Sequence, residues 1–181
     1  MSKLEEKKLG STLYYQNPFL HVYEDDVLLP NGGKSKRIVV THVGAVNVIA
    51  LTKNKELLLV RQYRYPLGME TIETPAGKLE QDEAPIITAK RELEEETGYT
   101  CDSLDLIGKH ASAPGFTNEV LHQFLAKDVK KLDILVEGDD DEFVEPLAVT
   151  KDQALKMIQT GEINDLKTVY AIQYLTLTGL W

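Results

Sequence analysis

Three glutamates, Glu92, Glu95 and Glu96, lie near the end of a segment with helical periodicity. At 100 degrees per residue they share an arc of about 100 degrees, so the three carboxylates point to the same side of the helix. The helix macrodipole is negative at this end, where Lys or Arg would be the stabilising choice. Two carboxylates about 5 Å apart repel by roughly 3 kcal/mol at an effective dielectric near 20, and a divalent cation would turn that repulsion into binding.

A solvated charged face is the alternative interpretation of this cluster, because exposed like charges four residues apart cost only about 0.2–0.5 kcal/mol per pair. Under the metal interpretation Mg²⁺ fits best, since it takes oxygen ligands and is shared between one or two carboxylates and substrate phosphates. Glu92 and Glu96 are one turn apart and can reach one ion, with Glu95 able to help hold a second. The carbonyl of Ala76 is a further candidate ligand, and Arg91 would pair with Glu95 and orient it.

The elements that must position these carboxylates follow from hydrophobic periodicity. Predicted strands cover residues 13–29, 37–42, 45–52, 57–65, 69–74, 104–112, 120–129 and 143–150. Predicted helices cover residues 84–96, 151–161 and 165–177. This order predicts an α+β fold, an α/β/α sandwich with a mixed sheet between helices and an N-terminal antiparallel β extension.

The helix that carries the glutamates is predicted to bury Ile86, Ala89 and Leu93, which recur at three and four residues. Gly98 follows as its C-cap. Cys101 is the single cysteine, so no intrachain disulfide can form, and we expect it to be a small core residue rather than a catalytic thiol.

Composition limits the classes of function. A chain of 181 residues with 43% hydrophobic and 27% charged residues can form one core plus an extension. A formal net charge of -9 argues against nucleic-acid binding, which needs a basic face. The N-terminal sequence lacks an apolar stretch, and no run approaches the roughly 20 apolar residues of a membrane span. We therefore expect a cytoplasmic protein with no membrane partner.

A fixed spacing joins the glutamates to residues before the helix. Gly77 is followed after five residues by Glu83 and after seven more by RELEEETGY at residues 91–99, which includes Gly98. This pattern resembles the Nudix box, G-x5-E-x7-R-E-U-x-E-E-x-G-U, where U is bulky and apolar. Seven fixed letters, each with a frequency near one in fifteen, give a chance match on the order of one in 10⁸ per window. The departure is Tyr99, where an aliphatic residue is usual, and it affects packing only.

The resemblance implies hydrolysis of a nucleoside diphosphate linked to another moiety, with the box as a loop-helix-loop metal site. Further segments, among them RQYRYPL, ETPAGKLE, SAPGFTNE and KTVYAIQYL, resemble the ADP-ribose pyrophosphatase branch over nearly all of residues 20–177. Pro114 and Gly115 fit the proline marker of that branch, although a plain turn would look the same. The implied reaction is Mg²⁺-dependent hydrolysis of ADP-ribose to AMP and ribose 5-phosphate, with Mn²⁺ as the alternative ion.

The same resemblance implies roles for residues outside the helix. Glu142, in the acidic loop GDDDEFVE, is the expected base that orients or deprotonates the attacking water, with Asp141 and Glu145 as alternatives. Calcium binding by this loop is disfavoured because the ligand spacing of an EF-hand is missing. Arg64 is expected to clamp the diphosphate, since guanidinium groups match phosphate oxygens.

Four further positions are expected near the substrate or the metals. Glu73 and Glu83 would lie beside the metals or at the terminal ribose. Glu119 resembles a residue that faces the terminal ribose. Arg37, on the N-terminal hairpin, is expected to reach the substrate across a dimer.

Members of this branch are commonly homodimers that exchange their N-terminal sheets, and the aromatic-rich stretch 14–23 is consistent with such an interface. We predict an N-terminal dimerisation extension over residues 1–43 and a Nudix hydrolase domain over residues 44–181. Two alternatives stay open. One is a pyrophosphatase for another nucleoside diphosphate sugar or dinucleotide, such as a GDP-sugar, and the other is a non-catalytic nucleotide sensor.

Overall fold

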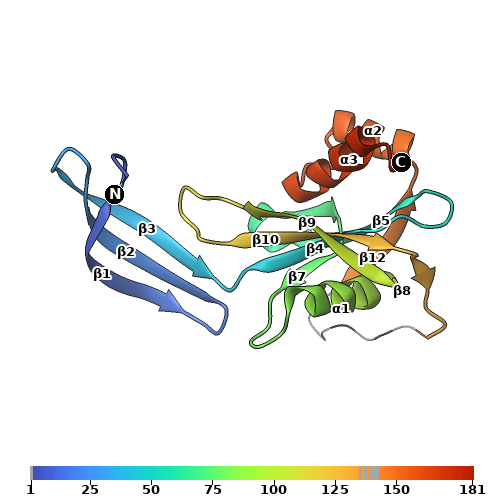
Figure 1. Cartoon of the computed structure of the whole chain (residues 1–181), viewed down its shortest axis with the longest axis horizontal. Coiled ribbons are helices and arrows are strands. Elements are labelled where there is room, and N and C mark those ends of the chain that lie inside the picture. Colours follow the sequence, from blue (N-terminus) through green and yellow to red (C-terminus); the bar gives the residue numbers. More distant parts are fainter. Residues whose placement is uncertain (1, 135, 137, 139–142) are drawn as a thin grey trace. The chain divides into compact units, whose positions relative to one another are not determined.

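The computed structural model describes residues 2–134, 136, 138 and 143–181 (Figure 1). The chain folds into two compact units. The first unit comprises residues 1–44 and 109–121, and the second comprises residues 45–108 and 122–181.

The first unit is built on an antiparallel sheet in the order β1 (Lys7–Gln16), β2 (Leu20–Leu28) and β3 (Lys34–His42). The predicted single strand over residues 13–29 is therefore wrong, because the chain turns at Asn17. The Asn17 Oδ1 accepts hydrogen bonds from the N–H groups of Phe19 and Leu20 at 3.1 and 2.7 Å. Such a side-chain turn separates β1 from β2.

The sheet of the first unit leaves large apolar side chains in solvent. Five of them are between 45% and 65% exposed: Leu9, Leu13, Tyr14, Tyr15 and Ile38. Within β1 to β3 the buried residues are Asp25 and Val27. A small sheet is marginally stable unless one apolar face is covered, so these exposed side chains are the apolar surface that a cover would bury.

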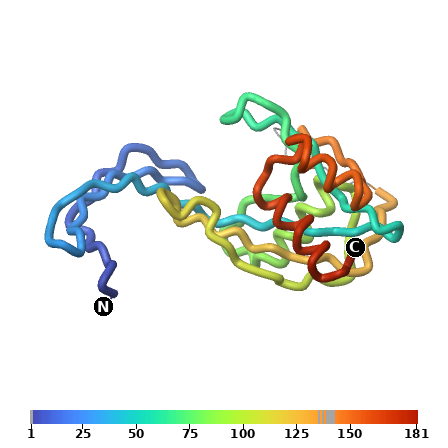
Figure 2. The backbone as a smooth tube through the Cα atoms, turned by 90° about the horizontal axis from the view of Figure 1, so that it is seen from above, coloured from blue at the N-terminus to red at the C-terminus, as the bar shows by residue number. Residues whose placement is uncertain are grey.

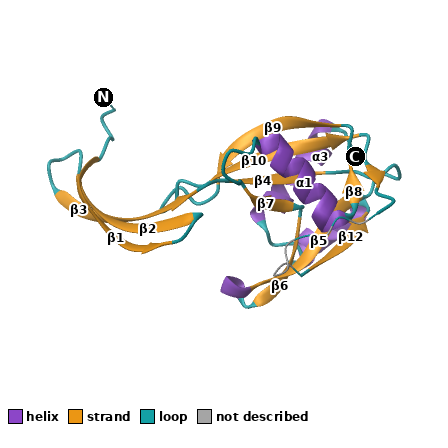
Figure 3. Cartoon of the chain, turned by 90° about the horizontal axis from the view of Figure 1, so that it is seen from below, coloured by secondary structure: helices purple, strands orange, loops and turns teal. Residues whose placement is uncertain are grey.

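Within the described residues, the second unit contains helices α1 to α3 and the strands that follow β3, except that the end of β9 and the start of β10 belong to the first unit; Figure 3 colours helices purple and strands orange. The strands are β4 (Ala45–Ile49), β5 (Leu57–Arg64), β6 (Met69–Glu73), β7 (Ala76–Lys78), β8 (Tyr99–Thr100), β9 (Ser103–Ala111), β10 (Val120–Lys127), β11 (Lys130–Lys131) and β12 (Val144–Val149). The helices are α1 (Pro85–Thr97), α2 (Lys151–Thr160) and α3 (Leu166–Thr178), with a short 3₁₀ turn, η1 (Tyr65–Leu67). The sheets run β7-β4-β10-β9, β12-β5-β6 and β11-β8.

Helices cover both faces of the sheets in this unit. In Figure 1, α1 lies on one side, while α2 and α3 lie on the other; Figure 2 shows α3, in red, running over the strands. Neighbouring residues of β4 pack into two different core clusters. Val48 packs in the cluster that contains Leu93 of α1, and Ile49 packs in the cluster that contains Ile172 of α3. The predicted α+β sandwich is confirmed.

The predicted buried stripe of α1 is partly wrong. Ala89 and Leu93 are fully buried, but Ile86, in the first turn, is 43% exposed. The buried side of α1 starts at Thr88 instead. At the other end Gly98 has φ 70°, and its N–H donates to the Glu94 carbonyl at 3.0 Å, as a left-handed C-cap does.

Two smaller expectations are also resolved. Cys101 is buried in the core, as predicted, and burial raises the pKa of its thiol. None of the described helices has both the length and the apolar character needed to cross a membrane.

Candidate active site

Of the three glutamates predicted to bind metal, Glu92, Glu95 and Glu96 on α1, two are buried. Glu92 and Glu96 are 6% and 5% exposed, so they lie within the buried face of the helix rather than beside it. Glu96 Oε2 accepts a hydrogen bond from the N–H of Ala76 at 2.8 Å. Glu92 Oε1 lies 2.9 Å from Arg91 Nη1, and Glu95 Oε2 accepts a hydrogen bond from the same nitrogen at 2.9 Å. The predicted pairing of Arg91 with Glu95 is therefore present.

Arg91 is surrounded by further acidic groups. Its Nη2 lies 3.3 Å from Glu80 Oε1 and 3.4 Å from Glu83 Oε2. Burial acts to lower the pKa of Arg91, but the negative charges around it, first that of Glu92, raise the pKa above its ordinary value. Arg91 is thus a permanent cation that holds the acidic side chains of the box together. Sequence reasoning missed Glu80.

The approach of β7 to α1 depends on Gly77. A Cβ added at this residue would lie 1.9 Å from Glu92 Oε1 and 2.0 Å from Glu92 Cδ. A side chain at this position would fit only if the Glu92 carboxylate moved, so with Glu92 as observed only glycine lets the backbone of β7 run this close to it. The first glycine of the box therefore has a steric reason here.

The residue types at this site fit a hard divalent cation. Glu92, Glu95 and Glu96 supply carboxylate oxygens from one turn of helix, and the backbone of Ala76 lies against Glu96. Burial makes these charges costly unless a cation compensates them. In the described part of the chain, no three acidic, His or Cys side chains already stand in a complete metal-binding arrangement. The oxygens named above meet Arg91 and the N–H of Ala76 instead.

A second buried ionic group lies where β5 and β6 end. Arg64 Nε and Nη2 donate to Oε1 and Oε2 of Glu73 at 2.8 and 2.7 Å, which is a bidentate fork. Thr71 Oγ1 and Lys167 Nζ also donate to Glu73, which is 2% exposed. Burial alone would raise the pKa of Glu73, but Arg64 and Lys167 lower it to about 2. Glu73 is therefore ionised at neutral pH.

This group is in electrostatic contact with α1. The hydrogen bonds from Arg64 to Glu73 raise the pKa of Arg64 most, and the charge of Glu96 raises it further. Arg64, predicted to bind phosphate, thus lies within the field of Glu96, one of the carboxylates predicted to bind metal. Sequence reasoning did not single out Lys167 or Thr71.

Four other predicted substrate residues belong to the first unit. Glu119 accepts a hydrogen bond from Ser112, and its Oε1 lies 3.4 Å from His42 Nδ1. Arg37 Nη2 donates to Glu6 Oε1 at 2.6 Å. Pro114 and Gly115 lie in the turn between β9 and β10. The roles of these residues at the substrate stay predictions.

The predicted base, Glu142, and the alternative Asp141 lie outside the described residues. The other alternative, Glu145, is exposed on β12 and stands opposite Arg61 of β5 in the strand register.

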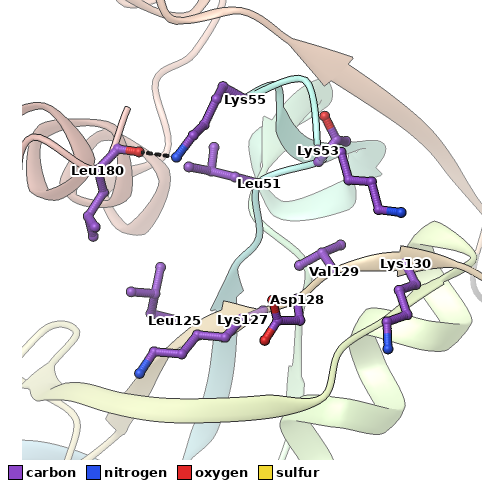
Figure 4. A pocket seen from close by; sticks show the side chains of 11 residues that line it. Leu51, Lys53, Lys55, Leu125, Lys127, Asp128, Val129, Lys130 and Leu180 are labelled. Carbon is purple, nitrogen blue, oxygen red and sulfur yellow. Dashed lines mark hydrogen bonds between the residues drawn. The ribbon is translucent and has the colours of Figure 1, made fainter.

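A separate hollow of about 390 Å³ in the second unit is rimmed by lysines (Figure 4). Most of this positive charge is used within the protein. Lys55 Nζ donates to the Leu180 carbonyl at 3.1 Å, Lys127 pairs with Asp105, and Lys130 pairs with Asp102. We therefore assign the chemistry to the α1 site rather than to this hollow.

The fold and the Nudix box place the chain in a known class. Residues 41–170 match the NUDIX domain, and residues 6–40 match the nucleoside diphosphate sugar hydrolase N-terminal domain. The chain belongs to the NUDIX domain family.

Individual relatives are similar over almost their whole length. An ADP-ribose pyrophosphatase of Bacillus subtilis (strain 168) is 47% identical, with 98% of this chain and 96% of the relative covered. A methanol dehydrogenase activator of Bacillus methanolicus is 46% identical with the same coverage. A GDP-mannose pyrophosphatase of Yersinia enterocolitica is 33% identical, with 96% of each chain covered. The crystal structure of an ADP compounds hydrolase shares the fold, with a TM-score of 0.83 at 19% identity, covering 99% of this chain and 98% of that one.

Proposed function

We propose that this Nudix hydrolase cleaves the diphosphate bond of ADP-ribose and releases AMP and ribose 5-phosphate, using Mg²⁺ or Mn²⁺. The observation that carries the proposal is the Nudix box with all seven fixed residues present, and with the buried Glu92 and Glu96 lying against β7. The 47% identity to a Bacillus subtilis ADP-ribose pyrophosphatase supports the choice of substrate. The intact glutamates argue against a non-catalytic sensor.

Each residue then has a physical task. Glu92, Glu95 and Glu96, with the Ala76 carbonyl, would hold the cation. A bound cation would neutralise charge on the diphosphate oxygens and lower the pKa of a water molecule. Arg91 keeps Glu92 and Glu95 in place through its 2.9 Å contacts.

The remaining tasks concern the substrate and the proton. Arg64 would bind the diphosphate, and Glu142, with Asp141 and Glu145 as alternatives, would take the proton of the attacking water. Pro114, Gly115 and Glu119 would bind the nucleoside and terminal ribose, and Arg37 would reach the substrate across a dimer.

A substrate panel tests the reaction. We expect kcat/KM for ADP-ribose to exceed that for GDP-mannose by at least about tenfold, because a pocket that hydrogen-bonds one base or sugar leaves polar groups unpaired with another. AMP and ribose 5-phosphate should appear in equal amounts. A preference for GDP-mannose would favour the second candidate, which the Yersinia relative supports. No turnover of any diphosphate would indicate the non-catalytic sensor.

We further propose that residues 1–43 form a dimerisation extension, that residues 44–181 form the catalytic domain, and that the protein acts as a cytoplasmic homodimer. The exposed apolar residues of β1 to β3, such as Leu13 and Tyr15, support this proposal because they need a cover. Sedimentation equilibrium should give twice the chain mass for the wild type, and Leu13→Glu should shift the protein toward monomer. A wild type that is monomeric at all concentrations would contradict the proposal.

A further inference from the structure

We propose that Lys167 and Glu73 are positioning residues, which hold the guanidinium of Arg64 in place for the substrate diphosphate without touching the substrate. The proposal rests on the proposed function, in which Arg64 binds the diphosphate. It concerns a chain of contacts that joins helix α3 to the end of β5.

Arg64 is the first step of this chain. Its side chain is 41% exposed and would be free to change rotamer on its own. The fork to Glu73 fixes the plane of the guanidinium through Nε and Nη2. Because Nε and Nη2 face Glu73, we place the diphosphate oxygen at the third guanidinium nitrogen, Nη1. A fixed plane lowers the entropy lost when a phosphate binds.

Glu73 is the second step, and four donors hold its carboxylate. Oε1 accepts from Arg64 Nε and from Thr71 Oγ1 at 2.5 Å, while Oε2 accepts from Arg64 Nη2 and from Lys167. Because each oxygen has one donor from Arg64 and one from elsewhere, the carboxylate cannot turn with Arg64. The hydrogen bonds from Thr71 and Lys167 thus fix the position of the Glu73 carboxylate, and the carboxylate in turn fixes the guanidinium of Arg64.

Lys167 is the third step and is itself fixed at the start of α3. Its Nζ also donates to Asp165 at 3.0 Å, and Asp165 is the N-cap that accepts from the Thr168 N–H at 3.0 Å. Thr168 Oγ1 in turn accepts from the N–H of Thr74 at 2.8 Å. Thr74 leads directly into β7, which carries Ala76. The first turn of α3 is therefore tied to both Arg64 and the strand beside the glutamates.

A double-mutant cycle tests whether Lys167 acts through Arg64. We expect Lys167→Met to raise KM about tenfold with kcat changed less than about threefold, because the lost interaction is made equally in the ground state and the transition state. Lys167→Arg, which keeps the charge, should recover part of the loss. In an Arg64→Ala background, Lys167→Met should have no further effect on KM. The control is Lys156→Met on α2, whose exposed side chain should leave both constants unchanged.

An equal rise in KM with and without Arg64 would overturn the proposal, since Lys167 would then act independently. So would a loss seen in kcat alone. KM is measured on whichever nucleoside diphosphate sugar the wild type hydrolyses, so failure of ADP-ribose as substrate is recognised separately from failure of the positioning role.

A readout without turnover protects the test against misfolded variants. The ¹H–¹⁵N signal of Arg64 Nε, assigned by its disappearance in Arg64→Lys, reports the fork to Glu73. We expect this signal to shift and to exchange faster with water in Lys167→Met, while Lys156→Met leaves it in place. An unchanged signal in a folded Lys167→Met protein would contradict the positioning role.

Discussion

Glu96→Gln is expected to reduce cation-dependent turnover of ADP-ribose by about 10²–10³-fold, and Glu92→Gln should do the same. Glutamine keeps the shape of the side chain, and its carbonyl oxygen can still accept the N–H of Ala76, which the Glu96 carboxylate does at 2.8 Å. The fold should therefore survive while the negative charge that holds the cation is lost. Initial rates over a range of Mg²⁺ concentrations measure the effect.

Glu94→Gln is the matched control for these changes. Glu94 lies on the same turn of α1, but its Oε1 accepts a hydrogen bond from Thr100, away from Arg91. Its turnover should stay within about threefold of the wild type. Near-normal rates in Glu96→Gln would contradict the assignment of these glutamates to the metal site. A comparable loss in Glu94→Gln would show that the effect comes from the total charge of this turn and not from the metal ligands.

Gly77→Ala is expected to reduce turnover by at least about a hundredfold, although it adds a single methyl group. The new Cβ would overlap Glu92 Oε1 at 1.9 Å, so either the carboxylate or the strand β7 must move. Either movement changes where Glu92 lies relative to Glu96 and to the Ala76 backbone, the groups proposed to hold the cation. Steady-state rates measure the loss, and thermal unfolding shows whether the variant is folded.

Gly10→Ala provides the comparison for this substitution. A Cβ at Gly10, in β1, would meet its nearest atom, Asp26 Oδ2, at an ordinary 3.5 Å. This variant should retain wild-type turnover. Full activity in a folded Gly77→Ala protein would mean that the close approach of β7 to Glu92 has no part in the reaction.

The sequence predicts the local parts of this site well. The helix that carries Glu92 and Glu96, its C-cap at Gly98 and the pairing of Arg91 with Glu95 all depend on residues four or fewer apart, where helical geometry fixes the neighbours. The α/β/α order also follows from periodicity alone. The turn at Asn17 was missed because aromatic and β-branched residues on both sides hid a local side-chain signal.

What depends on distant parts of the chain could not be predicted. Lys167 contacts Glu73, which is 94 residues away in the sequence, and the local sequence pattern of α3 does not predict that contact. The same limit applies to Gly77, which the motif marks but whose steric reason appears only when β7 lies against Glu92. Ile86 has the right spacing for burial, yet the buried side of α1 starts only at Thr88.

Calorimetric titration of Mn²⁺ or Mg²⁺ into the protein, in the presence of AMP, tests the metal site most directly. The wild type should bind the ion, the double variant Glu92→Gln with Glu96→Gln should not, and Glu142→Gln should still bind because its proposed task is proton transfer. A wild type that binds neither ion, or a double variant that binds as the wild type does, would contradict the assignment of the α1 glutamates to a metal-dependent hydrolase site.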